Sequence, residues 1–190
     1  MVTTVRGLVL APGASAGRDH PSLVTIDDAL TAHGLAVARI DFPYRIAGRR
    51  APDRQPVLVD TIVQAATLLA ERAGIEPGEI AFGGRSMGGR MCSIAVAEGL
   101  AAAALVLVSY PLHPPGKPDV LRTSHFPQLD LPCLFVSGTK DAFGTVAELE
   151  AATAAIPGPV THVWLEGGDH GLRRHNAAAV AAVEEFLVNQ

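Results

Sequence analysis

A short apolar run at residues 80–82 leads directly into a glycine-rich turn and then into an apolar segment with helical spacing. In this turn, Gly84 and Gly88 stand two residues on either side of Ser86. A strand that turns so sharply into a helix leaves no room for side chains at the two glycine positions, and it exposes the serine hydroxyl at the edge of a sheet. The pattern predicts a nucleophilic Ser86, with a structural glycine-rich turn as the alternative.

Two later apolar runs end beside residues that can activate a serine. Residues 131–137 read as a buried strand followed by a loop with Asp141, and residues 160–165 read as the last strand, followed by a loop with His170. A serine nucleophile requires a base that accepts its proton and an acid that orients the base. The order Ser86, Asp141, His170, each after a strand, fits a catalytic triad on a parallel sheet.

Three acidic residues are candidates for the partner of His170. Asp169 is its neighbour in the sequence, and neighbouring side chains on a short loop generally point apart. Glu166 ends the final strand and reaches the histidine only if the loop folds back. Asp141 follows the preceding strand, and parallel strands present their carboxyl ends at one edge of the sheet. We therefore predict that Asp141 is the acid.

An upstream loop can supply hydrogen-bond donors for a negatively charged oxygen. Residues 5–10 read as a strand that opens into small residues at 11–17. Such a loop can turn backbone N–H groups towards a developing oxyanion. We predict that Ala14 donates one N–H, and that Met87, directly after the serine, donates the other with help from the helix dipole. The alternative is an ordinary connection from a strand to a helix.

Short apolar runs alternate with helical patterns along the chain. This alternation is typical of a mostly parallel sheet covered by helices on both faces, so the predicted fold class is α/β, a three-layer α/β/α sandwich. The sheet is expected to have about six strands. The predicted strands are residues 5–10, 36–40, 80–83, 104–108, 133–137 and 161–165, and the predicted helices lie around residues 23–30, 58–69, 87–98, 145–156 and 176–188.

Arginines gather near the predicted catalytic edge, in the loop after the second strand and beside the serine. They are Arg45, Arg49, Arg50, Arg54, Arg85 and Arg90. They predict either a basic rim that attracts an anionic substrate, with Arg45 and Arg85 as candidate contacts, or a set of ion pairs. The acidic residues that could form such pairs are Asp41, Asp53 and Asp60.

Residues 109–131 contain five prolines and therefore cannot form one regular helix. We predict a loop or lid that borders the site. Tyr110 and His113 lie where the fourth strand ends, on the same edge as Ser86, and are candidates for contact with substrate. The alternative is that they anchor the proline-rich loop.

Composition favours one domain, residues 1–190, without nucleic-acid or membrane partners. The 190 residues are 48% hydrophobic and 18% charged, which allows a substantial core. The net charge of −4 argues against nucleic-acid binding. The first strand leaves no room for a signal peptide, and the longest apolar stretch, residues 100–108, is too short to cross a bilayer. A cytoplasmic location is expected.

The cysteines and the remaining histidines do not predict a metal site. Cys92 lies in the helix after Ser86 and Cys133 begins a strand, so we expect buried apolar side chains rather than a disulfide or metal ligands. The histidines outside the predicted triad lack the spacing of metal ligands. No cofactor and no metal are expected, and the sequence does not indicate an oligomeric state.

The chain resembles a small α/β-hydrolase, and more narrowly the dienelactone-hydrolase-related group that includes the KANL3/Tex30-like hydrolases. A serine stands at position 86 where dienelactone hydrolases proper use cysteine. The resemblance implies a minimal hydrolase fold without a cap domain. The matching stretches cover nearly the whole chain and lie at residues 10–14, 42–45, 48–52, 83–90, 110–118, 138–144 and 168–170.

The residues and the resemblance together imply a serine hydrolase. Ser86, Asp141 and His170 are expected to cleave carboxylic ester or thioester bonds of a small molecule, through an acyl-enzyme intermediate. The alternative is a non-catalytic α/β-hydrolase-like shell that serves as an interaction module, since a fold alone does not fix a function.

Overall fold

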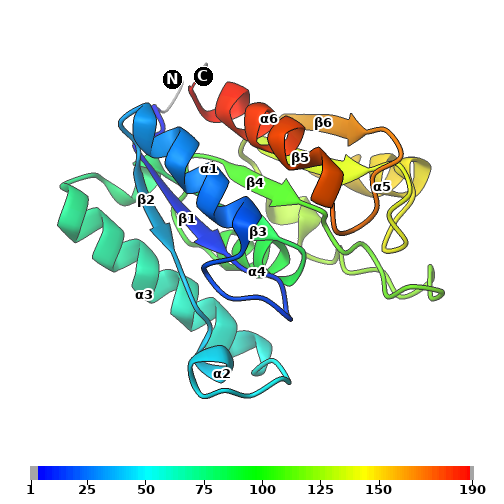
Figure 1. Ribbon diagram of the computed structural model, residues 1–190, viewed down its shortest axis with the longest axis horizontal. Coiled ribbons are helices and arrows are strands. Elements are labelled where there is room, and N and C mark those ends of the chain that lie inside the picture. Colours follow the sequence, from blue (N-terminus) through cyan, green and yellow to red (C-terminus); the bar gives the residue numbers. More distant parts are fainter. Residues whose placement is uncertain (1–3, 189–190) are drawn as a thin grey trace.

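The computed structural model describes residues 4–188 and contains a six-stranded sheet in which all neighbouring strands are parallel. The strand order is β2-β1-β3-β4-β5-β6 (Figure 1). Each predicted strand is present within two residues of its expected ends, and the sheet is entirely rather than mostly parallel. The strands are β1 (Gly7–Ala11), β2 (Ala36–Arg39), β3 (Ile80–Arg85), β4 (Leu105–Val108), β5 (Cys133–Gly138) and β6 (Val160–Leu165).

Helices cover both faces of the sheet, which confirms the three-layer α/β/α sandwich. They are α1 (Pro21–Ala32), α2 (Pro43–Ile46), α3 (Gln55–Ala73), α4 (Met87–Ala97), α5 (Val146–Thr153) and α6 (Asn176–Val188), with short 3-10 turns at Pro77–Glu79, Phe126–Gln128 and Arg173–His175. α1 and α6 pack together on one face, and α3, α4 and α5 lie on the other (Figure 1). The one-turn α2 has no counterpart among the predicted helices.

Two hydrophobic clusters fill the layers between the sheet and the helices. In β1, Leu8 and Leu10 belong to the cluster on the α1 and α6 face, whereas Val9 and Ala11 belong to the cluster on the α3 and α4 face. Successive side chains of a strand point to opposite faces, so a strand that is buried on both faces requires an unbroken apolar run. This requirement explains why Leu105–Val108 is apolar at every position.

Local signals fix the C-terminal end of α3 and the start of α5. α3 ends at Gly74, whose φ of 62° is a left-handed conformation that glycine adopts readily. α5 begins after Thr145, whose side chain accepts a hydrogen bond from the N–H of Glu148, while the Glu148 carboxylate accepts one from the N–H of Thr145. This capping box fixes the point at which the loop after β5 becomes a helix.

The strand order opens a crevice at the carboxyl edge of the sheet. From β1 the chain moves outward to β2, then returns to the other side of β1 as β3 and continues through β4, β5 and β6. The loops after β1 and β3 therefore diverge, and ligands of parallel sheets usually bind where this happens. Among residues 4–188, no helix combines the length and the apolar character that a membrane crossing requires.

Candidate active site

Ser86 lies in a strained turn between β3 and α4. Its backbone angles are φ 49° and ψ −118°, a conformation that costs residues with a side chain about 1–3 kcal/mol. A Cβ atom at either Gly84 or Gly88 would collide with the carbonyl oxygen of Ala11 in β1. The predicted tight turn, and the reason for its two glycines, are thus confirmed.

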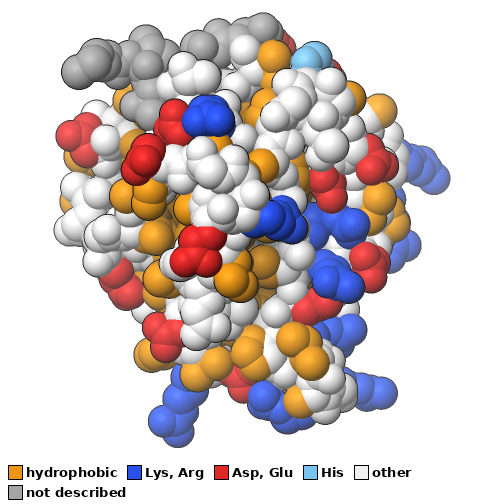
Figure 2. Space-filling model, turned by 90° about the vertical axis from the view of Figure 1, so that its left-hand side faces the viewer, with side chains coloured by type: hydrophobic (Ala, Val, Ile, Leu, Met, Phe, Trp, Pro, Cys, Tyr) orange, Lys and Arg blue, Asp and Glu red, His pale blue; other side chains and the backbone are white. Residues whose placement is uncertain are grey.

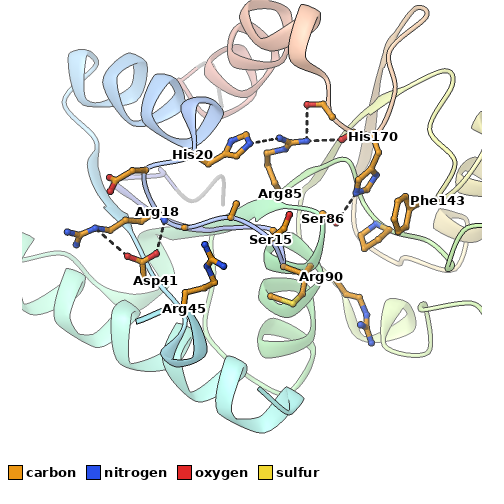
Figure 3. Close-up of a pocket in the computed structure, with 18 of the residues that line it drawn as sticks. Ser15, Arg18, His20, Asp41, Arg45, Arg85, Ser86, Arg90, Phe143 and His170 are labelled. Atoms are coloured by element: carbon orange, nitrogen blue, oxygen red, sulfur yellow. Dashed lines mark hydrogen bonds and ion pairs between the residues drawn. The ribbon is translucent and has the colours of Figure 1, made fainter. Parts of the chain in front are cut away.

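The structure joins Ser86, His170 and Asp141 in one hydrogen-bonded chain. Nε2 of His170 lies 2.9 Å from Oγ of Ser86 (Figure 3), and Nδ1 lies 2.8 and 3.0 Å from the two carboxylate oxygens of Asp141. An ionised carboxylate only accepts hydrogen bonds, so it keeps the proton on Nδ1 and leaves Nε2 free to accept the proton of the serine. The arrangement can therefore activate Ser86.

Close backbone contacts hold the loops of Asp141 and His170 side by side. A Cβ atom at Gly138 would collide with the carbonyl oxygen of Gly168, so the ends of β5 and β6 approach more closely than side chains would allow. The N–H of Lys140 also donates to the carbonyl of Gly168, at 2.8 Å. The distance between the acid and the base is thus set by backbone rather than by flexible side chains.

The other two acidic candidates make different contacts. Oδ1 of Asp169 accepts hydrogen bonds from the N–H groups of Gly171 and Leu172, at 2.9 and 3.1 Å, and so stabilises its own turn. Glu166 is exposed, and no hydrogen bond of its carboxylate is found among residues 4–188. Of the three acids, Asp141 is the one within hydrogen-bonding distance of the histidine.

Phe143 is a site residue that the sequence did not reveal. Its ring stacks on the imidazole of His170, with ring centroids 4.0 Å apart and 28° between the planes (Figure 3). Its N–H donates to Oδ1 of Asp141 at 2.8 Å, so the same residue contacts both the acid and the base. Its position two residues after Asp141 was the only available signal, and stacking depends on a loop conformation that spacing does not specify.

Both predicted donors of the oxyanion hole border the same cavity as Ser86. Ala14 and Met87 both line the cavity that contains the serine, and the Tyr44 hydroxyl donates to the carbonyl of Ala14 at 2.7 Å, which holds the loop after β1 in place. Met87 is the first residue of α4. Within residues 4–188, neither the Ala14 N–H nor the Met87 N–H has a hydrogen-bond acceptor.

A cavity of about 870 Å³, here called the catalytic pocket, opens over Ser86 and His170. Its walls come from the loop after β1, the start of α4, the segment between β4 and β5, and the loop after β6 (Figure 3). Arginines dominate its charged side chains. Those lining it are Arg18, Arg45, Arg85, Arg90, Arg122 and Arg173, together with Asp19 and Asp41.

The loop after β2 contributes one of its four predicted arginines to this pocket. Arg45 lines the pocket, and no salt bridge to it is found within residues 4–188. Arg49 pairs with Asp53 at 2.7 Å, and Arg50 and Arg54 are exposed and outside the pocket lining. Basic and acidic side chains are interspersed on the neighbouring face, shown in Figure 2. The ion-pair interpretation is thus confirmed for Arg49, whereas contact of Arg45 with an anionic substrate stays a prediction.

Asp41 pairs with Arg18, an arginine outside the predicted basic loop. Its carboxylate lies 3.6 Å from Nε of Arg18 and accepts a hydrogen bond from the Arg18 N–H at 2.8 Å (Figure 3). The predicted partners of Asp41, in the loop after β2, make no such contact. The reason is topological, because the loop after β1 passes beside the end of β2 and reaches Asp41 first.

Arg85, a predicted substrate contact, forms hydrogen bonds with other residues of the protein. Its Nη2 donates to the carbonyls of His170 and Gly171, at 2.7 and 3.0 Å, and its Nη1 lies 3.2 Å from Nε2 of His20 (Figure 3). Burial lowers the pKa of the Arg85 guanidinium, and the nearby carboxylate of Asp141 opposes this shift. Arg85 touches the pocket, but its hydrogen bonds support the histidine loop.

Tyr110 and His113 lie behind the pocket rather than in it, which corrects the prediction that they contact substrate. Tyr110 is 2% exposed, and its hydroxyl donates to the carbonyl of Arg122 at 2.6 Å. His113 is 5% exposed, with Nδ1 2.9 Å from the carbonyl of Pro114. Both side chains turn inward because the chain between β4 and β5 folds over them. They anchor this segment, whose Pro111 and Arg122 do border the catalytic pocket, as a loop was predicted to do.

Neither cysteine is part of a ligand cluster. Cys92 and Cys133 are buried and unbonded to each other, and burial raises the pKa of both thiols, that of Cys133 to about 12. Among residues 4–188, no three side chains of histidine, cysteine, aspartate or glutamate gather closely enough to hold a metal ion.

Comparisons with known proteins agree with this fold. Residues 4–186 match a family of sequences described as an alpha/beta hydrolase domain. Among solved structures, a dienelactone hydrolase from Anabaena variabilis superimposes with a TM-score of 0.80 at 20% identity, covering 98% of this chain and 87% of that one. Est1E from Butyrivibrio proteoclasticus gives 0.76 at 16% identity, covering 98% and 88%.

A third structure, a putative hydrolase of the alpha/beta superfamily from Xanthomonas campestris, superimposes with a TM-score of 0.72 at 20% identity, covering 97% of this chain and 99% of that one. At such identities these likenesses describe the fold. The family match extends over nearly the whole chain and includes Ser86, Asp141 and His170. The chain therefore belongs to the alpha/beta hydrolase domain family.

Proposed function

We propose that this hydrolase cleaves carboxylic ester or thioester bonds of a small molecule, with Ser86 as the nucleophile. The observation that carries the proposal is the continuous chain from the Asp141 carboxylate through His170 to the Ser86 hydroxyl, at the floor of an open pocket. The solved structures of similar fold include one from the lipolytic enzymes LipS and LipT, which agrees with this class of reaction.

The first half of the reaction forms an acyl-enzyme. Nε2 of His170 takes the proton of the Ser86 hydroxyl while Oγ attacks the carbonyl carbon, and the carbonyl oxygen becomes an oxyanion. We assign the role of oxyanion donors to the free N–H groups of Ala14 and Met87, and the positive end of the α4 dipole adds to the stabilisation. The tetrahedral intermediate then expels the alcohol or thiol, which receives the proton from His170.

The second half releases the acyl group. A water molecule gives a proton to Nε2 of His170 and attacks the acyl carbonyl, and the same N–H groups hold the oxyanion. The intermediate collapses, the Ser86 oxygen leaves and takes the proton back, and the carboxylic acid departs. Throughout, the Asp141 carboxylate holds the imidazole in one tautomer and stabilises its charged form.

The free positive charge in the catalytic pocket favours substrates that are themselves anionic. Arg45 points into the pocket (Figure 3) without an acidic partner among the described residues, and Arg90 lies in the first helical turn after Ser86. Unpaired guanidinium groups attract carboxylates and phosphates through charge and through paired hydrogen bonds. A small anionic ester or thioester is thus the proposed substrate.

The test is covalent labelling with a fluorophosphonate probe, located by mass spectrometry, together with hydrolysis of 4-nitrophenyl butyrate. The probe should attach to Ser86, and Ser86→Ala should lower kcat by about 10⁴-fold or more. Ser124→Ala, which removes an exposed hydroxyl outside the catalytic pocket, is the matched control and should label normally. Folded but unlabelled wild-type protein would instead support the non-catalytic interaction module.

A further inference from the structure

A second cavity, of about 540 Å³, adjoins the catalytic pocket and shares two side chains with it, Arg90 and Arg122. This side cavity lies between α4 and the segment that joins β4 to β5, with Ile94 and Val120 among its apolar lining. Both arginines therefore stand at the boundary between the two spaces. A substrate that extends from Ser86 into the side cavity must pass them.

The two positive charges are not neutralised by the protein. Within residues 4–188, neither Arg90 nor Arg122 has a carboxylate within salt-bridge distance, and the buried Nε of Arg90 has no acceptor at all. The acidic side chain that lines the side cavity is Glu98, the residue directly after α4. It lies eight residues after Arg90, which corresponds to about 12 Å along a helix. The boundary is thus a place of unpaired positive charge.

The positive charge of Arg90 lowers the pKa values of neighbouring basic groups. Burial lowers the pKa of Arg122, and the charge of Arg90 lowers it further, as expected for two like charges that lie near each other. The pKa of His125 is lowered to about 4 by burial and by the charge of Arg90. An anion between the arginines would replace this repulsion with two attractions.

Both arginines are held in place by the backbone. The N–H of Arg90 donates to the carbonyl of Ser86 at 3.1 Å, so it belongs to the same helical turn as the nucleophile. The backbone carbonyl of Arg122 accepts a hydrogen bond from the Tyr110 hydroxyl at 2.6 Å, and its backbone N–H donates to the carbonyl of Leu112 at 2.9 Å. Its Nη1 donates to the carbonyl of Pro111 at 3.4 Å. Buried Tyr110 thus holds Arg122 at the boundary, a role that explains its position behind the pocket.

We propose that Arg90 and Arg122 form a binding subsite for an oxyanion group of the substrate, a carboxylate or a phosphate, located beside the scissile bond at the entrance to the side cavity. The inference rests on the proposed hydrolase function and deepens it, because it assigns specificity to named residues. Guanidinium groups suit this task since each can donate two parallel hydrogen bonds to one oxyanion.

The first test compares two esters of equal chain length. 4-Nitrophenyl valerate is neutral, and mono-4-nitrophenyl glutarate carries a terminal carboxylate. The rate of spontaneous hydrolysis of each ester is subtracted from the measured rate. The ratio of kcat/KM for the anionic over the neutral ester should fall about tenfold or more in Arg90→Gln and in Arg122→Gln. Arg50→Gln, an exposed arginine outside both cavities, should leave the ratio unchanged. An unchanged ratio in both pocket variants overturns the subsite.

The second test measures binding without turnover. Ser86→Ala protein is titrated calorimetrically with glutarate, methyl phosphate and the neutral glutaramide. One of the two anions should bind more tightly than glutaramide, and the tighter anion shows whether the subsite takes a carboxylate or a phosphate. Adding Arg90→Gln and Arg122→Gln to the Ser86→Ala protein should abolish the difference in affinity between the anions and glutaramide. If the glutamine variants fail to fold, Arg90→Lys and Arg122→Lys replace them in this test. Lysine keeps the charge but not the paired hydrogen bonds, so these variants should retain part of the affinity for the anion. Equal affinity for glutaramide and both anions overturns the proposal.

The two tests separate the subsite from the proposed reaction. If the fluorophosphonate probe fails to label Ser86 but an anion binds through Arg90 and Arg122, the subsite stands and the hydrolase function falls. If Ser86 is labelled and both esters are cleaved with no dependence on the arginines, the function stands and the subsite falls.

Discussion

Nη2 of Arg85 lies 2.7 Å from the carbonyl oxygen of His170, so the residue before the nucleophile holds the loop of the base. The same guanidinium group contacts Nε2 of His20 at 3.2 Å, at the end of the loop that carries Ala14. Burial and the charge of Arg85 lower the pKa of His20. Arg85 thus joins the loops of the nucleophile, the base and the predicted oxyanion donor.

Replacement of Arg85 should mainly affect the chemical step. Lysine keeps the charge but cannot bridge two carbonyl groups and a ring nitrogen at once. We expect Arg85→Lys to lower kcat about 10- to 100-fold while KM changes little, because a small displacement of His170 weakens its contact with Ser86. Steady-state kinetics and the rate of fluorophosphonate labelling measure this effect.

The control for Arg85 is an arginine with a simpler structural bond. Arg72 donates to a single carbonyl, that of Val37, at 3.2 Å on the surface, so Arg72→Lys should leave kcat and KM unchanged. A rise in KM alone for Arg85→Lys would contradict the positioning role and would return Arg85 to the substrate contacts that the sequence suggested.

Two glycines provide a matched test of the turn at Ser86. In Gly88→Ala the new methyl group meets the carbonyl oxygen of Ala11 in the central sheet, and neither can move without disturbing the core, so we expect destabilisation of at least about 3 kcal/mol or failure to fold. Gly78 has no atom within 4 Å of its would-be Cβ, and Gly78→Ala should change stability by less than about 1 kcal/mol. Urea unfolding compares the two, and equal stabilities would disprove the close approach.

The fold could be predicted from the sequence because its signals are local. Each strand is a short apolar run, and burial on both faces demands such runs regardless of the neighbours. The proximity of Ser86, Asp141 and His170 was also predictable, because each follows a strand and parallel strands bring their carboxyl ends to one edge of the sheet. Helix boundaries were less accurate at α5, which ends at Thr153 rather than near residue 156.

Contacts that depend on loop conformation could not be predicted. The stacking of Phe143 on His170 and the pairing of Arg18 with Asp41 require loops from distant parts of the chain to meet. The direction of Tyr110 was equally hidden, since a residue at a strand end can face the pocket or the core. Sequence position alone places a side chain near the edge and does not say which way it points.

Stability should fall in mild acid because of His125. Burial and the charge of Arg90 lower its pKa to about 4 in the folded protein, whereas in the unfolded chain it is near 6.5. Between these values the unfolded state binds more protons, so the free energy of unfolding decreases as pH falls from about 6.5 towards about 4, by roughly 2–3 kcal/mol at most. Urea denaturation across this range measures the slope.

The control for this pH effect removes the titrating group. Nε2 of His125 lies 2.8 Å from the Ser93 hydroxyl, a contact that the amide of glutamine can preserve. His125→Gln should therefore show a shallower loss of stability in acid than the wild type. Parallel slopes in the two proteins would assign the acid sensitivity to other groups.

Asp141→Asn decides whether the acid acts through the tautomer of His170. The Asp141 Oδ1 atom also accepts the Phe143 N–H at 2.8 Å, and an asparagine oxygen can do the same, so the loop should keep its conformation. The asparagine NH₂ group would then face Nδ1 and favour the tautomer with the proton on Nε2, which cannot accept the proton of Ser86. We expect kcat to fall by about 10³- to 10⁴-fold with the fold intact.

Asp169→Asn is the matched control, because its amide oxygen can still accept the N–H of Gly171, and its kcat should stay near wild type. Near wild-type turnover in Asp141→Asn, with collapse in Asp169→Asn, would show that the observed carboxylate contact does not serve catalysis.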